Sequence, residues 1–455
     1  MIELHYESGT LLASGASPEE LPAAFVRDDR TGQWRAPASA YRAAVLGLRE
    51  AGLPYKDGAA RFEKLSLESR IAMEPRPYQR EALAAWRGGE PELRGVVVLP
   101  TGAGKTAVAV TAIERVGRST LVVVPTLALM KQWYSVLSDA FGGSVTVGLL
   151  GGGYHEITPL TVTTYDSAYI HAERYGDRFA LAVFDEVHHL PAPKNAIIPK
   201  MMVAPYSLGL TATPERPDGG HEELPDLVGP VCYRRSAEDF AGTYLASYEQ
   251  IRIPIELTAH ERYEYAQADA LYRDFLHKHR LSMRSPEDWQ HFIMVASTSH
   301  SGGREALLAA RRRREIQAGA MRKGTTLEAL LKQHWEDRSI IFTKSVDEVY
   351  NLSERFLIPG ITYETPARER KEVLDRFREG RYRAIIASDV LNEGVDVPDA
   401  NVAIILAGSA SHREYVQRLG RILRPKDGKR ALLYELVTSE TGEEFTAHRR
   451  REVAR

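Results

Sequence analysis

A chain of 455 residues with 44% hydrophobic and 26% charged residues has a globular composition and enough length for about three domains. Cys232 is the single cysteine, which excludes an intramolecular disulfide, a cysteine zinc site and a four-cysteine iron–sulfur cluster. Lys and Arg number 59 against 61 Asp and Glu, so any binding of nucleic acid requires local basic patches. The sequence has no run of about 18 apolar residues and no leader of signal-peptide type at its start. We therefore expect a cytoplasmic protein that does not enter a membrane.

Residues 1–70 are expected to form a small α+β domain. Apolar and polar residues alternate over 2–7 before Ser8-Gly9 and a second short apolar run, which predicts a β-hairpin. A helical pattern follows over 41–51 and stops at Gly52-Leu53-Pro54. No residues here have catalytic spacing, so packing or gripping a substrate is the expected role.

Two α/β domains are expected next, over 71–238 and 239–455. In both, short runs of Val, Leu and Ile alternate with amphipathic segments, which predicts parallel sheets covered by helices on both faces. A nucleotide would bind at the carboxyl ends of the first set of strands. The strand-like runs are VVVL at 96, LVVVP at 121, the segment 144–150, LTVTTY at 160, LAVFDE at 181 and LGLTAT at 208, then SIIFTK at 339, YRAIIAS at 382, VAIIL at 402 and ALLYEL at 431.

A segment over about 256–325 lacks strand patterns and is expected to be a helical insertion. Its aromatic residues are interpreted as core, because a stacking platform for single strands needs exposed rings. They are Tyr263, Tyr265, Tyr272 and Phe275.

The insertion also carries a run of four arginines, Arg311 to Arg314. If Leu308 and Ile316 define the apolar side of a helix, Arg313 and Arg314 point away from it. These two arginines are candidate contacts to DNA phosphates. A solvated basic helix end is the alternative.

The stretch VVVLPTGAGKT at 96–106 has the order strand, glycine turn, helix. Gly102, Ala103 and Gly104 would let backbone N–H groups approach phosphates, Lys105 would reach the β and γ phosphates, and Thr106 would ligate Mg²⁺. The stretch departs from the general phosphate-loop pattern because Leu99 stands at the first glycine position.

A second motif follows about 80 residues later, where an apolar strand ends in Asp185 and Glu186. One carboxylate could hold Mg²⁺, and the other could orient or deprotonate a water. A solvated acidic turn is the alternative, and the phosphate loop makes it less favoured.

The segment YVQRLGRILRP at 415–425 places Arg418, Arg421 and Arg424 on one broad helix face. Such a face is often only solvated. In the second α/β domain, however, these arginines could reach a transferred phosphoryl group when the two domains close.

Taken together, the motifs resemble those of superfamily two helicases in their order along the chain. DEVH followed by HLP, and TAT followed by a charged loop, are most similar to the XPB family in its prokaryotic form. The similarity covers almost the whole chain and is strongest over 71–430. It rests on RPYQREAL at 76, LPTGAGKT at 99, VVPTLAL at 123, TTYDSA at 163, DEVHHLP at 185, GLTATPER at 209, IIFT at 340, SDVLNEGVDVP at 388 and QRLGRILR at 417.

The resemblance implies two RecA-like domains in tandem, a damage-recognition domain at the N-terminus and a thumb-like insertion. It implies an ATP- and Mg²⁺-dependent DNA helicase or translocase, moving 3′ to 5′ on single-stranded, duplex or forked DNA in repair such as nucleotide excision repair. Open alternatives are a duplex translocase that does not separate strands and an ATP-gated clamp on damaged DNA that recruits a nuclease. An RNA helicase is less favoured, because DEVH and TAT stand where DEAD and SAT would.

The resemblance also implies roles by position. Gln79, with Arg76 beside it, would read adenine, and Gly394 and Asp396 would face the nucleotide from the second domain. Asp185 would bind magnesium, and Glu186 would be the base. The remaining implied roles are domain coupling by His188, Thr211, Thr213 and Gln417, arginine fingers at Arg421 and Arg424, and DNA contacts at Pro125, Thr126, Thr164, Arg216 and Asp218.

One departure concerns the loop after TAT, which reads Arg216-Pro217-Asp218 where family members commonly carry Arg-Glu-Asp. Proline removes the middle acid and a backbone donor and fixes φ. The resemblance therefore supports ATP hydrolysis more strongly than strand separation.

Overall fold

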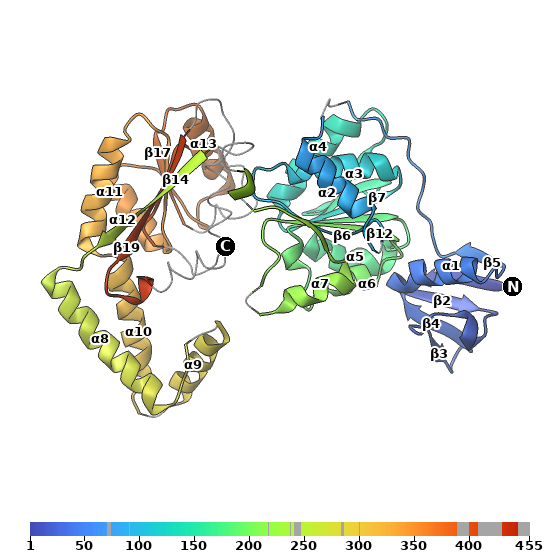
Figure 1. The fold of residues 1–455 in the computed structure, drawn as a ribbon, viewed down its shortest axis with the longest axis horizontal. Helices are drawn as coiled ribbons and strands as arrows, with labels where there is room; N and C mark the ends of the chain where they lie inside the picture. The colour runs from blue at the N-terminus through green and yellow to red at the C-terminus, as the bar shows by residue number, and fades with distance from the viewer. Residues whose placement is uncertain are drawn as a thin grey trace. The chain divides into compact units, whose positions relative to one another are not determined.

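The computed structural model (Figure 1) describes residues 1–70, 74–90, 92–216, 218–236, 238–240, 247–283, 286–299, 301–388, 400–407 and 430–444. The chain divides into two compact units, 1–99 with 104–235 and 100–103 with 236–455. Its three sheets fall within residues 2–58, 94–234 and 247–438. The α/β class expected from the sequence is confirmed, and the domain boundaries stay predictions.

The N-terminal sheet has five strands in the order β3-β4-β2-β1-β5. β1 and β2 pair antiparallel, which confirms the predicted hairpin, and the predicted helix is α1. Leu4, Leu11 and Leu48 are fully buried in the core. The elements are β1 (Ile2–Glu7), β2 (Thr10–Ser14), β3 (Val26–Asp28), β4 (Gln33–Pro37), α1 (Tyr41–Glu50) and β5 (Tyr55–Gly58).

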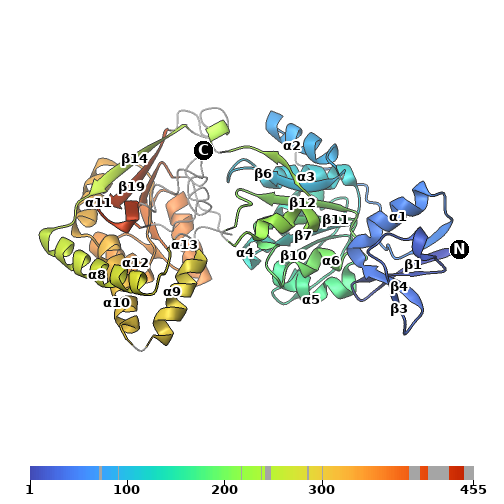
Figure 2. The same cartoon turned by 60° about the horizontal axis from the view of Figure 1, so that its bottom comes forward.

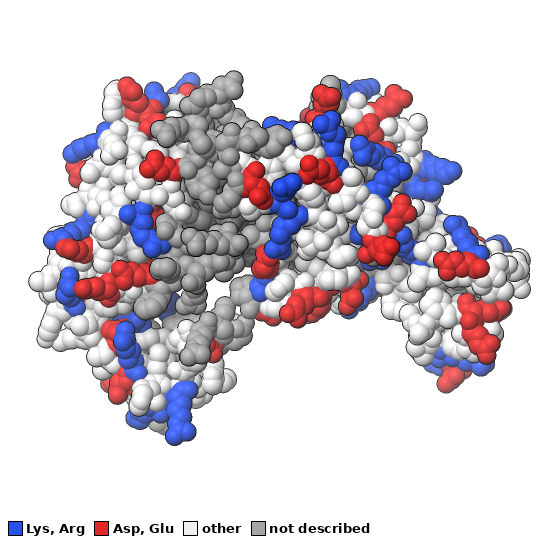
Figure 3. Space-filling model, in the orientation of Figure 1, with Lys and Arg blue, Asp and Glu red and all other residues white. Residues whose placement is uncertain are grey.

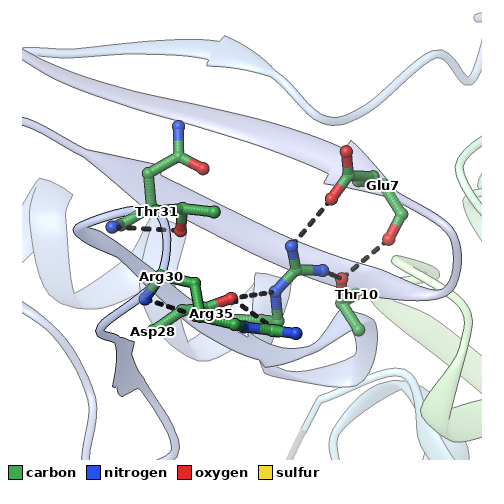
Figure 4. A network of polar contacts seen from close by, with 7 residues as sticks. Glu7, Thr10, Asp28, Arg30, Thr31 and Arg35 are labelled. Atoms are coloured by element: carbon green, nitrogen blue, oxygen red, sulfur yellow. Dashed lines mark hydrogen bonds and ion pairs between the residues drawn. The ribbon is translucent and has the colours of Figure 1, made fainter.

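A polar network crosses this sheet (Figure 4). The Arg35 guanidinium on β4 donates to Thr10 Oγ1 at 2.6 Å and to Glu7 Oε2 at 2.7 Å, and its Nε lies 3.8 Å from Asp28 Oδ2. Asp28 also pairs with Arg30. Opposite charges on neighbouring strands support pairing modestly, so we interpret the network as structural.

The second sheet has eight strands in the order β13-β6-β12-β11-β7-β10-β8-β9, and its strand pairs are parallel except β8 with β9. Figures 1 and 2 show helices on both faces, α2 and α3 on one and α5 and α6 on the other. The strands are β6 (Arg94–Val98), β7 (Thr120–Val124), β8 (Val147–Gly151), β9 (Tyr154–His155), β10 (Leu160–Thr164), β11 (Leu181–Asp185), β12 (Tyr206–Thr211) and β13 (Val231–Arg234). The helices are α2 (Pro77–Arg87), α3 (Lys105–Val116), α4 (Leu127–Phe141), α5 (Tyr165–Tyr175), α6 (Ile197–Lys200) and α7 (Leu224–Leu227).

The N-terminal sheet packs onto this second sheet's domain within one compact unit. The Tyr6 hydroxyl lies within 3.0 Å of three backbone carbonyl oxygens. Burial raises the pKa of Tyr6 to about 12, so the hydroxyl stays a donor. Val203, from the segment after α6, completes the N-terminal core. The three carbonyls belong to Ala172, Glu173 and Met201.

The third sheet is parallel throughout its described pairs, in the order β14-β19-β18-β15-β17-β16. The sequence reading missed β14, which pairs with β19 along nine residues but precedes the helical insertion in the chain. The elements are β14 (Ser247–Ile255), α11 (Met321–Gln333), β15 (Ser339–Phe342), α12 (Val346–Phe356), β16 (Gly360–Ile361), α13 (Ala367–Arg378), β17 (Ala384–Ala387), β18 (Val402–Ile405) and β19 (Arg430–Thr438).

The predicted helical insertion is confirmed as α8 (Ala259–Lys278), α9 (Pro286–Thr298) and α10 (Gly303–Ala318). Tyr265, Tyr272 and Phe275 are buried, as expected of core residues, whereas Tyr263 is 64% exposed.

The orientation expected for Arg313 is wrong, whereas Arg314 is an exposed residue. Arg313 pairs with Asp269 at 2.7 Å and lies 4.3 Å from the Tyr272 ring centre, and Arg314 lies 4.1 Å from that of Trp289. Leu308, assigned to the apolar side, is 55% exposed. The true packing face of α10 is a stripe of small residues that leaves room for the rings of α8 and α9. The Arg313 guanidinium therefore stacks inside the insertion, and the exposed Arg314 lies over the Trp289 ring. The stripe is Ala306, Ala309 and Ala310, continued by Ile316.

Charges on the described surface are mixed. Acidic and basic side chains are interspersed on the face shown in Figure 3. In the described part of the chain, no helix combines the length and apolar character needed to cross a membrane.

Candidate active site

The phosphate-loop motif forms the turn between β6 and α3. Gly102 and Gly104 have φ values of 86° and 78°, in the left-handed region that favours glycine, and Gly104 caps α3. The Lys105 ammonium donates to the carbonyl of Leu99 at 3.3 Å, and Thr106 follows in the first turn of α3. The turn therefore leads into a helix N-terminus, whose backbone N–H groups attract anions.

Gln79 lies directly against this turn. Its side chain is buried, Oε1 accepts from Arg76 N at 2.9 Å, and Nε2 donates to the Gly104 carbonyl at 3.3 Å. A Cβ on Gly104 would lie 2.6 Å from Nε2, so a larger residue here would displace the Gln79 amide. Gln79 and Arg76, expected to contact adenine, thus stand next to the proposed phosphate cradle.

Asp185 ends β11 in a buried position. Its Oδ2 accepts from Trp133 Nε1 at 2.8 Å and its Oδ1 accepts from Glu186 N at 3.1 Å. Burial and the neighbouring Glu186 charge raise the pKa of Asp185 to about 6, while the Trp133 hydrogen bond and the Lys105 charge act in the opposite direction. The carboxylate thus accepts hydrogen bonds from two neutral donors.

Glu186 has a backbone φ of 47°, which is unusual for a residue with a side chain and typical of functional turns. Its Oε2 lies 3.3 Å from Thr211 Oγ1 and 3.5 Å from His188 Nδ1. The fully buried His188 places Nδ1 3.0 Å from the same hydroxyl, and Thr213 N donates to it at 3.2 Å. The Thr211 hydroxyl therefore connects the end of β12 to the acidic turn after β11.

The loop after β12 is tied to the same turn. Arg216 Nε donates to Asp218 Oδ1 at 2.8 Å, a second guanidinium nitrogen binds Asp218 Oδ2, and a third donates to the His188 carbonyl at 2.7 Å. Arg216 holds the pKa of Asp218 far below its usual range. Expected to contact DNA, these two side chains pair with each other in this structure, and Pro217 lies outside the described residues.

The residues expected to contact DNA lie at the same edge of the sheet, after strands β7 and β10. Pro125 follows β7, and Thr126 caps α4 by accepting from Leu129 N at 3.2 Å. Thr164 ends the adjacent strand β10 and caps α5 by accepting from Ser167 N at 3.3 Å. Helices α4 and α5 thus begin after two neighbouring strands, β7 and β10, and β7 is the neighbour of β11.

Sequence reasoning missed two residues at this site, Trp133 and Tyr165. The Tyr165 hydroxyl donates to the Asp185 carbonyl at 3.1 Å. Both lie far from Asp185 in sequence, so no local pattern signals them. Five predicted site residues lie outside the described residues, and their roles stay predictions: Gly394, Asp396, Gln417, Arg421 and Arg424.

The donor set suits a hard cation held jointly with a bound phosphate. Across the described residues, no group of three or more His, Cys, Asp or Glu side chains could hold a metal alone. Asp185 offers carboxylate oxygens with lone pairs left over from two hydrogen bonds, and Thr106 offers a hydroxyl. Mg²⁺ typically binds through one or two such oxygens plus substrate phosphates.

Parallel sheets and these motifs define a helicase built from two RecA-like domains. Residues 72–216 match the family described as "Type III restriction enzyme, res subunit", and 322–426 match "Helicase conserved C-terminal domain". Residues 4–59 match "Xeroderma pigmentosum group B helicase damage recognition domain". The chain belongs to the XPB family.

Similar proteins support this assignment. "DNA 3'-5' translocase XPB2" of Sulfurisphaera tokodaii is 39% identical over 458 residues, covering 99% of this chain and 100% of the relative. "DNA 3'-5' helicase XPB" of Mycobacterium tuberculosis is 32% identical, covering 88% of this chain and 67% of the relative. The Kineococcus radiotolerans protein of the same name is 33% identical, and the chain spans 62% of its length.

A solved structure shows the same fold. The Pyrococcus furiosus Hef helicase domain matches with a TM-score of 0.57 at 19% identity, covering 85% of this chain and 100% of that domain.

Proposed function

We propose that this protein is an ATP-dependent DNA helicase or translocase that moves 3′ to 5′ on DNA during repair. The observation that carries the proposal is the strand order β6-β12-β11. It places the phosphate loop, the Thr211 turn and the Asp185-Glu186 turn at the carboxyl ends of three adjacent strands, where α/β sheets bind nucleotides. The relatives named as 3′-5′ translocases and helicases supply the substrate class and direction.

In this proposal the phosphate loop binds the triphosphate. Backbone N–H groups around Gly102, Ala103 and Gly104 would receive phosphate oxygens, and Lys105 would leave the Leu99 carbonyl to meet the β and γ phosphates. When bound, Mg²⁺ held by Thr106 and Asp185 would neutralise charge that develops on the phosphates. Gln79 and Arg76 would contact the base.

Glu186 would orient and deprotonate the attacking water. Thr211 and His188 hold its carboxylate within about 3.5 Å of their polar atoms, so the base is fixed before substrate arrives. His188, Thr211, Thr213 and Gln417 would pass the nucleotide state between the domains. From the second domain, Gly394 and Asp396 would contact the nucleotide, and Arg421 and Arg424 would stabilise the transition state.

DNA would lie across the half of the edge formed by β7 and β10. There Pro125, Thr126 and Thr164 start α4 and α5, whose N-terminal N–H groups suit backbone phosphates. Arg216 and Asp218 would contact DNA only if the ion pair between them were broken. This requirement, together with Pro217, favours duplex translocation without strand separation as the second candidate. A nuclease partner stays a further hypothesis.

Two assays test the proposal. Steady-state ATP hydrolysis with single-stranded DNA, duplex DNA and RNA should show stimulation by DNA and little by RNA. Strand displacement on 3′- and 5′-tailed duplexes should then show activity on the 3′ tail. Stimulation by DNA without displacement selects the duplex translocase, and absence of stimulation by any DNA overturns both candidates.

A further inference from the structure

The hydrogen bond from Trp133 to Asp185 joins helix α4 to the end of strand β11, two elements that are not consecutive in the chain. Trp133 is 2% exposed on α4, and its Nε1 lies 2.8 Å from Oδ2 of Asp185 at the end of β11. The other carboxylate oxygen accepts from the Glu186 backbone. The carboxylate plane is therefore held at one end by its own turn and at the other end by a separate helix.

The nature of the donor is informative. A buried carboxylate is costly unless its charge is compensated, and an arginine or lysine in place of the indole would compensate it permanently. The indole N–H satisfies one lone pair and brings no positive charge. About four lone-pair directions exist on an ionised carboxylate, so a cation can still bind. The arrangement orients the group while leaving its charge available.

The position of Trp133 on α4 adds a second consequence. The same helix starts immediately after Thr126, whose side chain caps it. The indole thus ties Asp185 to the helix whose N-terminus is proposed to meet the DNA backbone.

We propose that Trp133 is a positioning residue that holds the Asp185 carboxylate for Mg²⁺ bound with ATP. The inference rests on the proposed function. Removing an outer partner of a metal ligand typically weakens metal affinity or activity 10- to 100-fold. A change of this size is expected when Trp133 loses its N–H.

The test compares Trp133→Phe with a matched control, Trp86→Phe. Trp86 on α2 is also 2% exposed, and its Nε1 donates at 2.9 Å to the Ser207 carbonyl instead of a carboxylate. Both variants keep an aromatic ring and lose one buried indole hydrogen bond. Binding of a fluorescent ATP analogue is titrated with Mg²⁺ and, separately, in EDTA.

We expect Trp133→Phe to need roughly 10- to 100-fold more Mg²⁺ for nucleotide binding, with binding in EDTA unchanged and Trp86→Phe close to wild type. Equal Mg²⁺ requirements in the two variants overturn the inference. Equal loss with and without Mg²⁺ also overturns it, because Trp133 would then only support the fold. If the wild type itself shows no Mg²⁺-dependent binding, the proposed function fails instead.

Should Trp133→Phe not fold, tryptophan emission replaces it. Mg²⁺ added to the nucleotide complex should change emission in the wild type and in Trp86→Phe but not in Asp185→Asn. An Mg²⁺-independent emission in the wild type, with Mg²⁺-dependent nucleotide binding intact, overturns the inference.

Discussion

Two regions of this molecule place a charged side chain against aromatic residues, but they differ in whether a second charge compensates the first. In the acidic turn after β11, Asp185 accepts hydrogen bonds from Trp133 and a backbone N–H, both neutral. In the helical insertion, Arg313 stacks on Tyr272 and pairs with the Asp269 carboxylate.

The difference is charge compensation. Arg313 meets an opposite charge inside its own insertion, so the cluster is complete without a ligand. The Asp185 carboxylate is oriented by neutral donors, which leave its negative charge available for the proposed cation. In this chain we therefore interpret the Arg313 cluster as structural and Asp185 as part of the proposed metal site. Substitutions in the two regions should therefore change different quantities.

The largest effect is expected from Glu186→Gln. The amide keeps the shape of the side chain but cannot take the proton, so ATP turnover should fall by about 10²- to 10⁴-fold. Nucleotide affinity and the melting temperature should stay close to wild type. Steady-state hydrolysis and nucleotide titration measure this, and wild-type turnover would remove Glu186 from the role of base.

Lys105→Ala should have the next largest effect. Loss of a charge-assisted contact to phosphate should weaken ATP binding by roughly 10- to 100-fold and lower turnover as well. Nucleotide titration by calorimetry measures the affinity. The melting temperature without nucleotide serves as control, and a collapse there would make Lys105 structural.

Arg313→Ala should lower the stability of the fold without changing ATP hydrolysis. Removing the guanidinium uncovers the rings and weakens the pairing of Asp269, which Arg273 still contacts at 2.7 Å. We expect a loss of about 2 kcal/mol in the free energy of unfolding. Arg311→Ala, at a side chain 77% exposed, should cost less than about 0.5 kcal/mol. Chemical denaturation of both variants provides the comparison.

The same variant tests DNA contact. Because Arg313 faces the interior of the insertion, the dependence of DNA affinity on salt should be unchanged in Arg313→Ala. A salt slope reduced by about 0.7 to 0.9 would show that Arg313 does neutralise a phosphate.

The smallest effect concerns pH. The pKa of Asp185 is raised to about 6 from its ordinary 3.8, so the metal-free folded protein retains this proton in acid better than the unfolded chain does. Asp185 thus favours the folded state below pH 4, and that contribution is lost as pH rises from about 4 to 6.

Protons and Mg²⁺ compete for the same carboxylate. Below about pH 6, the Mg²⁺ concentration needed for nucleotide binding should rise by up to about tenfold per pH unit. Titrations at pH 5 and 7 measure the change. Asp218 stays ionised over this range and so cannot cause such a change. A pH-independent Mg²⁺ requirement would contradict the assignment of Asp185 as the metal ligand.

Motifs that act through neighbouring residues could be read from the sequence. A glycine turn before Lys105, and two acids at the end of an apolar strand, express their chemistry over a few residues. The residues that join these motifs could not be predicted in this way. Trp133 lies 52 positions before Asp185, and β12 enters the sheet between β6 and β11 although it comes last of the three in the chain.

The same distinction explains the wrong orientation of Arg313. Helical spacing defines which residues share a face, and it does so correctly for Ala306, Ala309, Ala310 and Arg313. Which face is buried depends on the neighbouring helices, whose rings require small residues opposite them and accept a guanidinium. The order of residues along the chain determines local conformation and local chemistry, because both depend on interactions within a few residues. Strand order, the buried face of a helix and the partner of a buried charge arise from packing between distant segments, so they become visible only in the folded chain.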